Sequence, residues 1–115
     1  MKIDRFEDII AWQKAKVLTL RLYLLFKDNR DFSFRDQICR ASASVMNNIA
    51  EGFERNSDKE LKHFLYIAKG SSGEVRSMLY LAAGLKYIDN ESFNELLESS
   101  TEVSRLLSGL IKTLS

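Results

Sequence analysis

Proline is absent from all 115 residues of the chain. Proline interrupts helices more strongly than any other residue, and the helix formers Leu, Ala, Glu and Lys are abundant here, so long helices are permitted throughout. Helices must therefore end at polar stretches, and three of these stand out, at residues 27–31, 56–57 and 89–90. They divide the chain into four segments, each suited to a helix of about 20 residues, or about 30 Å.

Two of these stretches also carry signals for the start of a helix. Ser57 and Glu60 have the spacing of a capping box, in which each side chain accepts a hydrogen bond from the backbone amide of the other residue. Asp89 or Asn90, followed by Glu91, marks a second start, because short polar side chains cap helices and acids favour the positive end of the helix dipole. The third helix should begin at the first signal and the fourth at the second.

Apolar periodicity predicts amphipathic helices in the second and last segments. In the last segment the apolar residues recur at spacings of three and four: Phe93, Leu96, Leu97, Val103, Leu106, Leu107, Leu110, Ile111 and Leu114. The second segment, residues 34–55, repeats this pattern with Phe34, Ile38, Ala41, Val45 and Ile49. Each of these helices should bury one face.

The first segment is ambiguous, because residues 18–24 alternate apolar and polar side chains as a strand would. We still expect a helix, since the chain has no second strand to pair with and no turn residue between Ile9 and Phe26. On a helical wheel the apolar residues cover more than one face. This excess predicts a second buried surface, against another subunit or a different partner.

Gly70 and Gly73 in the third segment each cost a helix about 1 kcal/mol relative to alanine, so a break is one interpretation of this stretch. We prefer a continuous helix whose small residues let a neighbouring helix approach closely. Four helices joined by short connections then predict an all-α fold, an antiparallel up-down-up-down four-helix bundle, as a single domain over residues 1–115.

Several classes of protein are excluded by the composition. Three acids within the first eight residues, with no long apolar run after them, argue against a signal peptide or a membrane span, and we expect a cytoplasmic protein. Cys39 and His63 are each the only residue of their kind, which excludes an internal disulfide and a zinc cluster. Glu60-x-x-His63 forms one arm of a di-metal site that needs two. With no nucleophile elbow or phosphate-binding loop either, we expect no metal, no cofactor and no enzymatic activity.

The chain resembles the bacterial four-helix-bundle family of 23S rRNA-intervening-sequence proteins. The resemblance covers nearly the whole length and is carried by residues 12–15 (WQKA), 37–41 (QICRA), Ser44, 48–52 (NIAEG), 64–65, 67–68, 70–71 and Glu74. Met46 departs from it, because the family usually has proline there, and this should leave the second helix straighter. A related branch is similar to the accessory variability determinant of diversity-generating retroelements, a homopentamer that binds nucleic acid and a reverse transcriptase. The resemblance thus implies a homo-oligomer, with five copies favoured, that acts as a scaffold for a polyanion.

A set of polar residues matches the family and lies on the second and third segments: Gln37, Arg40, Ser44, Asn48, Glu51, Ser71 and Glu74. They could form a ligand site or an internal hydrogen-bonded layer, and we favour the layer, because buried polar groups can fix helix register. A buried Arg40 would need a carboxylate, from Glu51 or Glu74. Its replacement by alanine would then cost about 3 to 5 kcal/mol.

A basic stripe runs along the third segment, although the net charge of the chain is only +1. Its residues are Lys59, Lys62, Tyr66, Lys69, Arg76 and Tyr80. The last three cations recur every seven residues, so they drift only about 20° per step around a helix. Cations neutralise phosphates and tyrosines stack on unpaired bases, which is typical of proteins that bind single-stranded nucleic acid. A solvated face, or a contact with the acidic fourth helix of a neighbouring subunit, would explain the same pattern.

Two functions remain open from the sequence. The first is a self-assembling adaptor that binds RNA or single-stranded DNA. The second is a scaffold for protein partners whose charged faces only keep it dissolved. The two differ in their response to salt, because counterion release makes nucleic-acid binding strongly salt-dependent, whereas a helix docked in an apolar groove is less sensitive.

Overall fold

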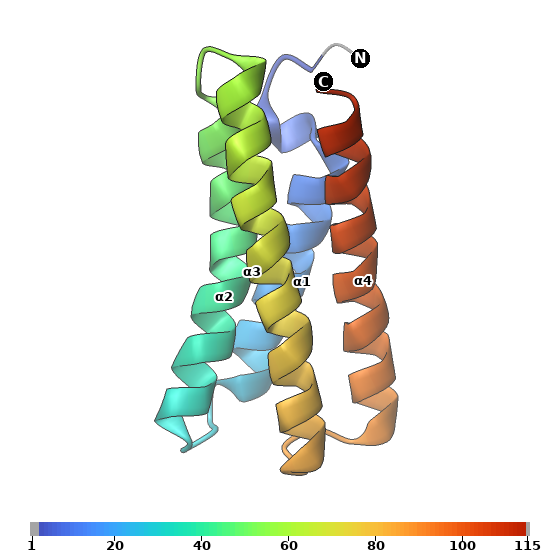
Figure 1. Cartoon of the computed structure of the whole chain (residues 1–115). Coiled ribbons are helices and arrows are strands. Elements are labelled where there is room, and N and C mark those ends of the chain that lie inside the picture. The colour runs from blue at the N-terminus through green and yellow to red at the C-terminus, as the bar shows by residue number, and fades with distance from the viewer. Residues whose placement is uncertain (1–2, 115) are drawn as a thin grey trace.

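Four long helices and no strands make up the described part of the chain, residues 3–114 of a computed structural model. A short 3-10 helix, Phe6–Asp8, is followed by α1 (Ile10–Phe26), α2 (Phe32–Phe53), α3 (Asp58–Gly84) and α4 (Asn90–Lys112). Successive helices run in opposite directions along a bundle that measures 42 × 22 × 19 Å (Figure 1). The predicted all-α four-helix bundle is confirmed.

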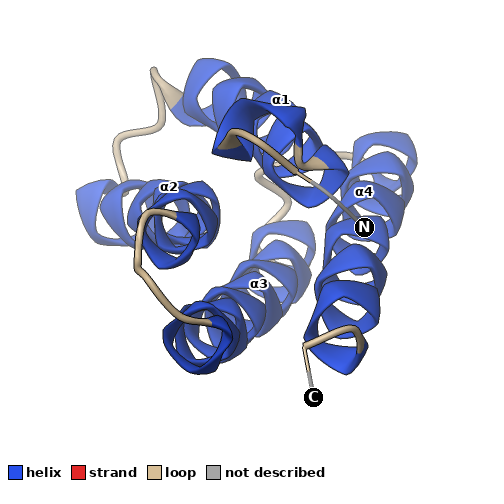
Figure 2. Ribbon diagram, turned by 90° about the horizontal axis from the view of Figure 1, so that it is seen from above, coloured by secondary structure: helices blue, strands red, loops and turns tan. Residues whose placement is uncertain are grey.

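The arrangement of the helices decides which faces remain outside. α1 and α3 lie diagonally across the bundle, and each contacts both α2 and α4 (Figure 2). The outer faces of α1 and α3 therefore point to opposite sides of the molecule. Over the described residues, no helix combines the length and the apolar character that crossing a bilayer requires.

Short polar side chains begin the last three helices. Asp31 accepts a hydrogen bond from the amide of Phe34 at 3.1 Å, and Ser57 and Asp89 do the same for Glu60 and Ser92, at 3.1 and 2.7 Å. The two predicted starts are confirmed. The second half of the capping box is replaced by an ion pair, because the Glu60 carboxylate lies 3.6 Å from the guanidinium of Arg55.

The core consists of two apolar clusters stacked along the bundle axis. One cluster includes Leu22, Phe26, Phe34, Ile38, Leu79 and Leu96. The other includes Ile49, Leu65, Val103, Leu107 and Ile111. Between the clusters lies a layer of buried hydroxyls, one from each helix: Thr19, Ser42, Ser72 and Ser100. This hydroxyl layer is the internal polar layer of the bundle, and it was not predicted from the sequence.

The role of the glycines differs from the expectation. α3 is continuous through Gly70 and Gly73, as predicted, but neither glycine marks a close approach between helices: a Cβ at Gly70 would have no neighbour within 4 Å, and one at Gly73 would only lie 3.8 Å from the Arg76 guanidinium. The close approach is at Gly52 of α2, where a Cβ would lie 2.6 Å from the Cβ of Phe64. Only glycine fits here without moving α2 or α3.

Candidate nucleic-acid interface

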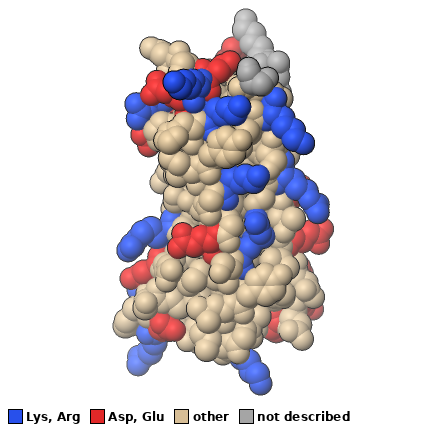
Figure 3. Space-filling view, in the orientation of Figure 1, with Lys and Arg blue, Asp and Glu red and all other residues tan. Residues whose placement is uncertain are grey.

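The basic stripe lies on the surface of α3. Lys59 and Lys69 are exposed, and Lys62 and Arg76 are half-buried. Figure 3 shows Lys and Arg side chains one below another on the upper half of the front of the molecule, where α3 runs, with an acidic side chain beside the lowest of them. Among the residues that the structure describes, none of these four cations forms a salt bridge. Their charges are therefore available to an anionic partner.

The two tyrosines of the basic stripe present partly exposed rings. Tyr66 is 54% exposed and Tyr80 is 60% exposed. The ring of Tyr80 packs edge-on against Phe93 of α4, with centroids 5.1 Å apart. Large aromatic side chains usually bury most of their surface, and an exposed ring offers a face on which a base can stack.

Two of the α4 acids point away from the basic stripe. The α4 acids Glu95 and Glu102 form ion pairs with Arg21 and Lys14 of α1, on the other side of the helix. The Arg76 guanidinium reaches across from α3 and donates a hydrogen bond to the Ser104 hydroxyl of α4. Within one subunit, Glu95 and Glu102 therefore do not neutralise the basic stripe, and none of its cations forms a salt bridge among the described residues.

Two further cations on this side of α4, Arg105 and Lys112, were not predicted from the sequence. Both are exposed, and they border the same hollow as Arg76. Residues 87–115 contain five acids and only these two cations, so the segment is acidic by its charge count. Such a count does not separate the two sides of a helix. Arg105 and Lys112 are seven residues apart, as are the last three cations of the basic stripe, and this spacing indicates that they share one side of α4.

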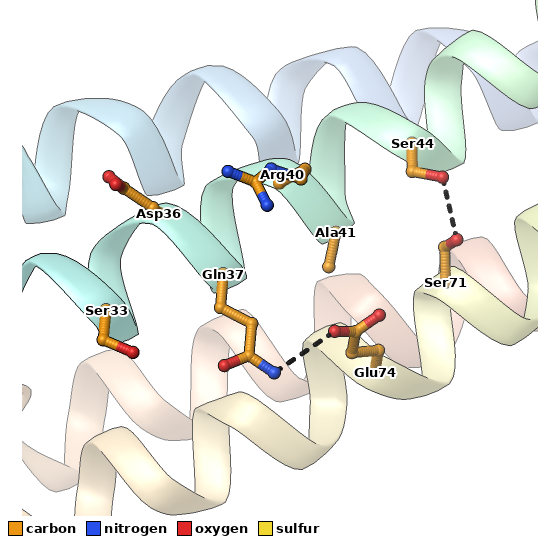
Figure 4. A pocket seen from close by; sticks show the side chains of 8 residues that line it. All are labelled: Ser33, Asp36, Gln37, Arg40, Ala41, Ser44, Ser71 and Glu74. Carbon is orange, nitrogen blue, oxygen red and sulfur yellow. Dashed lines mark hydrogen bonds between the residues drawn. The ribbon is translucent and has the colours of Figure 1, made fainter.

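The predicted polar layer is not internal. Gln37, Arg40, Glu51 and Glu74 are exposed, and Ser44, Asn48 and Ser71 are half-buried. These residues lie along the outer seam between α2 and α3, and five of them line a hollow of 610 Å³ there (Figure 4). The prediction of a buried layer is wrong, because the α2 members lie away from the apolar face of α2, and Ser71 and Glu74 of α3 border the same outer seam.

The predicted buried ion pair of Arg40 is also wrong. Glu51 pairs with Arg55 at 3.0 Å, and Glu74 accepts a hydrogen bond from Gln37 at 3.5 Å. Arg40 stands on the outer ridge of α2, and its guanidinium points away from Glu74 (Figure 4). No buried charge is left uncompensated when Arg40 is removed, so the large destabilisation expected from the sequence has no structural basis.

Three half-buried residues of the seam do form a hydrogen-bonded group. The hydroxyls of Ser44 and Ser71 lie 2.9 Å apart and connect α2 to α3. The Asn48 amide donates to the backbone oxygen and to the hydroxyl of Ser44, at 2.8 and 2.9 Å. The Ser44–Ser71 contact fixes the register of α2 against α3, and Asn48 holds the Ser44 hydroxyl in place; fixing the register is the role predicted from the sequence for the whole polar set.

The reactive side chains of the chain occupy separate places. Cys39 is buried in the core, and burial raises the pKa of its thiol, so the thiolate is disfavoured. His63 is exposed beside the ring of Phe64, and Glu60 of the same motif is bound to Arg55. Among residues 3–114, no three His, Cys, Asp or Glu side chains gather where they could share a metal ion.

Comparisons with known proteins support the family suggested by the sequence. The sequence model of the 23S rRNA-intervening sequence protein family matches residues 7–109. A crystal structure of a protein of unknown function from the S23 ribosomal protein family of Bacteroides thetaiotaomicron superposes with a TM-score of 0.83 at 26% identity, over 89% of this chain and 98% of that chain. No curated protein matches the chain. The similarity to the retroelement accessory protein stays a prediction, and the match over most of the sequence shows that the chain belongs to the 23S rRNA-intervening sequence protein family.

Proposed function

We propose that the chain is a self-assembling binding module without enzymatic activity, which holds RNA or single-stranded DNA on the basic stripe of α3. The observation that carries the proposal is the set of cations without salt bridges among the described residues, together with two half-exposed tyrosines along one helix. From Lys59 to Tyr80 the basic stripe extends about 30 Å at 1.5 Å per residue. This length suits the four or more nucleotides that single-strand binding sites hold.

Self-assembly is supported by the outer face of α1. Val17, Leu20 and Leu24 are 64%, 54% and 66% exposed, although they lie in the middle of a helix. Together with Ile10 they recur at spacings of three, four and seven residues, which is the pattern of a helix that packs against another helix. We propose that a second copy covers this face, and that the copies form a cytoplasmic ring in which five is the favoured number.

The two features act together because they lie on opposite sides of the bundle. In a ring each subunit uses two different surfaces, and if α1 packs on a surface of the neighbouring copy other than α3, the basic stripe of each subunit stays open to solvent. Every copy would then add the same modest contacts, and their effects on affinity would multiply through effective concentration. A ring would therefore hold a long nucleic acid more tightly than one subunit could.

A triple variant tests the nucleic-acid part of the proposal. Lys62→Ala, Lys69→Ala and Arg76→Ala together should weaken the binding of RNA and single-stranded DNA of any sequence, without dissociating the assembly. The slope of log affinity against log salt should fall by about 0.7 for each phosphate that the variant no longer neutralises. Fluorescence anisotropy with mixed-sequence oligonucleotides, at two salt concentrations, measures both quantities.

The control is a triple variant of cations elsewhere, Lys16→Ala, Lys27→Ala and Arg30→Ala, which removes the same charge from α1 and from the loop after it. Equal losses in both variants would mean that only net charge matters, and the basic stripe would then not be the site. Unchanged binding in the first variant would exclude the basic stripe as well.

The second candidate function, a scaffold for protein partners, is favoured by the apolar outer face of α1. An amphipathic helix of another protein could cover this face as a second copy would. Binding of such a partner should change little between low and high salt. Retention of a partner by the parent but not by Leu24→Glu, together with no binding of oligonucleotides, would support this candidate over the first.

A further inference from the structure

A shallow hollow of 460 Å³ lies between α3 and the C-terminal half of α4, beside the basic stripe. Arg76 of α3 and Arg105 and Lys112 of α4 supply three cations to its lining. Thr101, Ser104 and Ser108 supply three hydroxyls. The remaining lining residue is Gly109, where a Cβ would have no neighbour within 4 Å, so the α4 surface is low at this point.

Among the described residues, no carboxylate lines this hollow. Arg105 also borders a second hollow, in which Asp4 and Asp8 lie, but the Asp8 carboxylate is 3.5 Å from Arg5 and neither acid forms a salt bridge with Arg105. Across the part of the chain that the structure describes, Arg76, Arg105 and Lys112 all lack a salt-bridge partner. Three cations of this kind around one concave surface create a local field that attracts an anion.

Hydrogen bonds fix the position of one cation in advance. The Ser104 hydroxyl accepts from the Arg76 guanidinium and lies 2.8 Å from the hydroxyl of buried Ser72. A half-buried arginine held in this way loses less side-chain entropy when it binds a ligand. Its planar guanidinium donates pairs of hydrogen bonds that match the oxygens of a phosphate, and the neighbouring hydroxyls can donate further ones.

We propose that this hollow is a phosphate-binding site, formed by Arg76, Arg105 and Lys112 with the hydroxyls of Thr101, Ser104 and Ser108. This proposal rests on the proposed function, because the phosphate is taken to belong to a single-stranded nucleic acid that lies along the basic stripe. Arg76 belongs to both features, so the strand passes from Lys62 and Lys69 into the hollow. The site extends the interface from one helix to two.

Paired variants test the site with oligonucleotides. Arg105→Ala with Lys112→Ala removes two cations of the hollow and leaves the basic stripe intact. Lys27→Ala with Arg30→Ala removes one lysine and one arginine at the opposite end of the bundle and serves as the control. The first pair should weaken binding about tenfold relative to the control, a loss of roughly 1.4 kcal/mol. Equal affinities of the two pairs would overturn the site while leaving the basic stripe in place.

The source of the phosphate is distinguished in the same experiment. Oligonucleotides with and without a 5′-phosphate should differ in affinity for the parent if the hollow takes a terminal phosphate. They should bind equally if it takes an internal phosphodiester. In the first case, the Arg105 and Lys112 substitutions should weaken mainly the binding of oligonucleotides that carry the 5′-phosphate. In the second case, they should weaken the binding of both kinds equally.

A second measurement does not depend on nucleic acid. Titration with inorganic phosphate, followed by NMR of the arginine Nε–Hε groups, should shift Arg76 and Arg105 more than chloride at equal ionic strength does. If phosphate shifts them and no oligonucleotide binds, the proposed function fails and the hollow remains a phosphate site with another source. If phosphate and chloride act alike, the phosphate site is wrong.

Discussion

One side chain of the buried hydroxyl layer has no hydrogen-bond partner among the described residues. Thr19 donates to the backbone oxygen of Ala15 at 2.7 Å and the Ser42 hydroxyl to that of Cys39 at 2.9 Å, but the fully buried Ser100 hydroxyl is left unpaired among residues 3–114. A buried polar group left without a partner costs about 1 to 3 kcal/mol. Ser100→Ala should therefore raise the free energy of unfolding by about 1 kcal/mol, as measured by urea denaturation.

Ser72→Ala is the matched control in the same layer. The Ser72 hydroxyl lies 2.8 Å from that of Ser104, so its loss should destabilise the bundle by about 1 kcal/mol. If both substitutions lower stability equally, the Ser100 hydroxyl has a partner in solution, and the hydroxyl layer is fully satisfied.

Replacing Arg40 by alanine should have little effect on stability, unlike the replacement of a buried residue. Its side chain is exposed and forms no salt bridge among the residues described, so Arg40→Ala should change the free energy of unfolding by less than about 0.5 kcal/mol. Urea denaturation of the parent and the variant measures this difference. A loss of several kcal/mol would mean that assembly buries Arg40 against a carboxylate of another copy.

The sequence did not correctly predict which polar side chains are buried, and the reason is physical. Arg40 and its polar neighbours on α2 lie opposite the apolar face of that helix, so the periodicity of the sequence alone predicts that they are exposed. The expected buried layer went against this periodicity. Ser42 and Ser100 lie within apolar faces, between Ile38 and Val45 and between Leu96 and Val103. Each serine lies four residues after one apolar residue and three before the next, which places it on the buried face, but this was not predicted. Residue type indicated the opposite, because serine is mostly exposed in folded proteins.

Replacing a glycine by alanine should have opposite effects on stability in α2 and α3. Gly52→Ala should destabilise the protein by about 1 to 3 kcal/mol, because its Cβ would meet the Cβ of Phe64, which cannot move without α3. Gly70→Ala should stabilise it by about 0.5 to 1 kcal/mol, because a Cβ there meets nothing and alanine favours the helix. Thermal unfolding of the two variants measures both signs, and equal effects would contradict the packing of α2 on α3.

The cap of α2 predicts how stability depends on pH. Asp31 accepts hydrogen bonds from the Tyr87 hydroxyl at 2.7 Å and from the amide of Phe34, and both hold the pKa of its carboxyl below the ordinary value. A carboxyl whose pKa is lower in the folded state stabilises the fold above its unfolded pKa. This stabilisation is lost as the pH falls through the folded pKa. The melting temperature of the parent should therefore fall on acidification below about pH 4.

Asp31→Asn should flatten this fall, and Asp28→Asn, in the same loop but outside these hydrogen bonds, should leave it unchanged. The same pH dependence in all three proteins would assign the effect to other carboxyls. Asp89, whose pKa is lowered by its hydrogen bonds with Ser92, is the first alternative.

Helix starts were predictable because a cap is a local structure, decided within four residues of sequence. The contact at Gly52 was not, because it depends on which helix lies opposite and at what distance. For the same reason, the sequence placed the four helices but not the sides on which the acids of α4 fall. Glu95 and Glu102 pair with α1, and only the packed bundle shows that Arg105 and Lys112 of α4 lie beside the basic stripe.

At the scale of the whole molecule, the exposed face of α1 is too apolar for a helix that meets water alone. Covering Val17, Leu20 and Leu24 would remove aliphatic surface from water, and each fully buried side chain of this kind contributes roughly 1.5 to 3 kcal/mol. Three such residues in every copy support the proposed self-assembly. α3 lies diagonally opposite α1, so a copy that covers α1 does not by that contact cover the α3 of the same subunit.

Leu24→Glu should dissociate the assembly without unfolding the subunit, because it places a charge in the interface and leaves the core of the bundle untouched. Light scattering should report an oligomer for the parent and a monomer for the variant, while circular dichroism shows the same helix content for both. The control is Leu81→Glu, at a residue of α3 that is 46% exposed, and it should keep the parent's mass. A parent that is monomeric at micromolar concentration would contradict self-assembly and would also remove the avidity on which tight binding of nucleic acid depends. If Leu81→Glu dissociates the assembly and Leu24→Glu does not, the copies meet through α3, and the basic stripe lies beside an interface instead of an open surface.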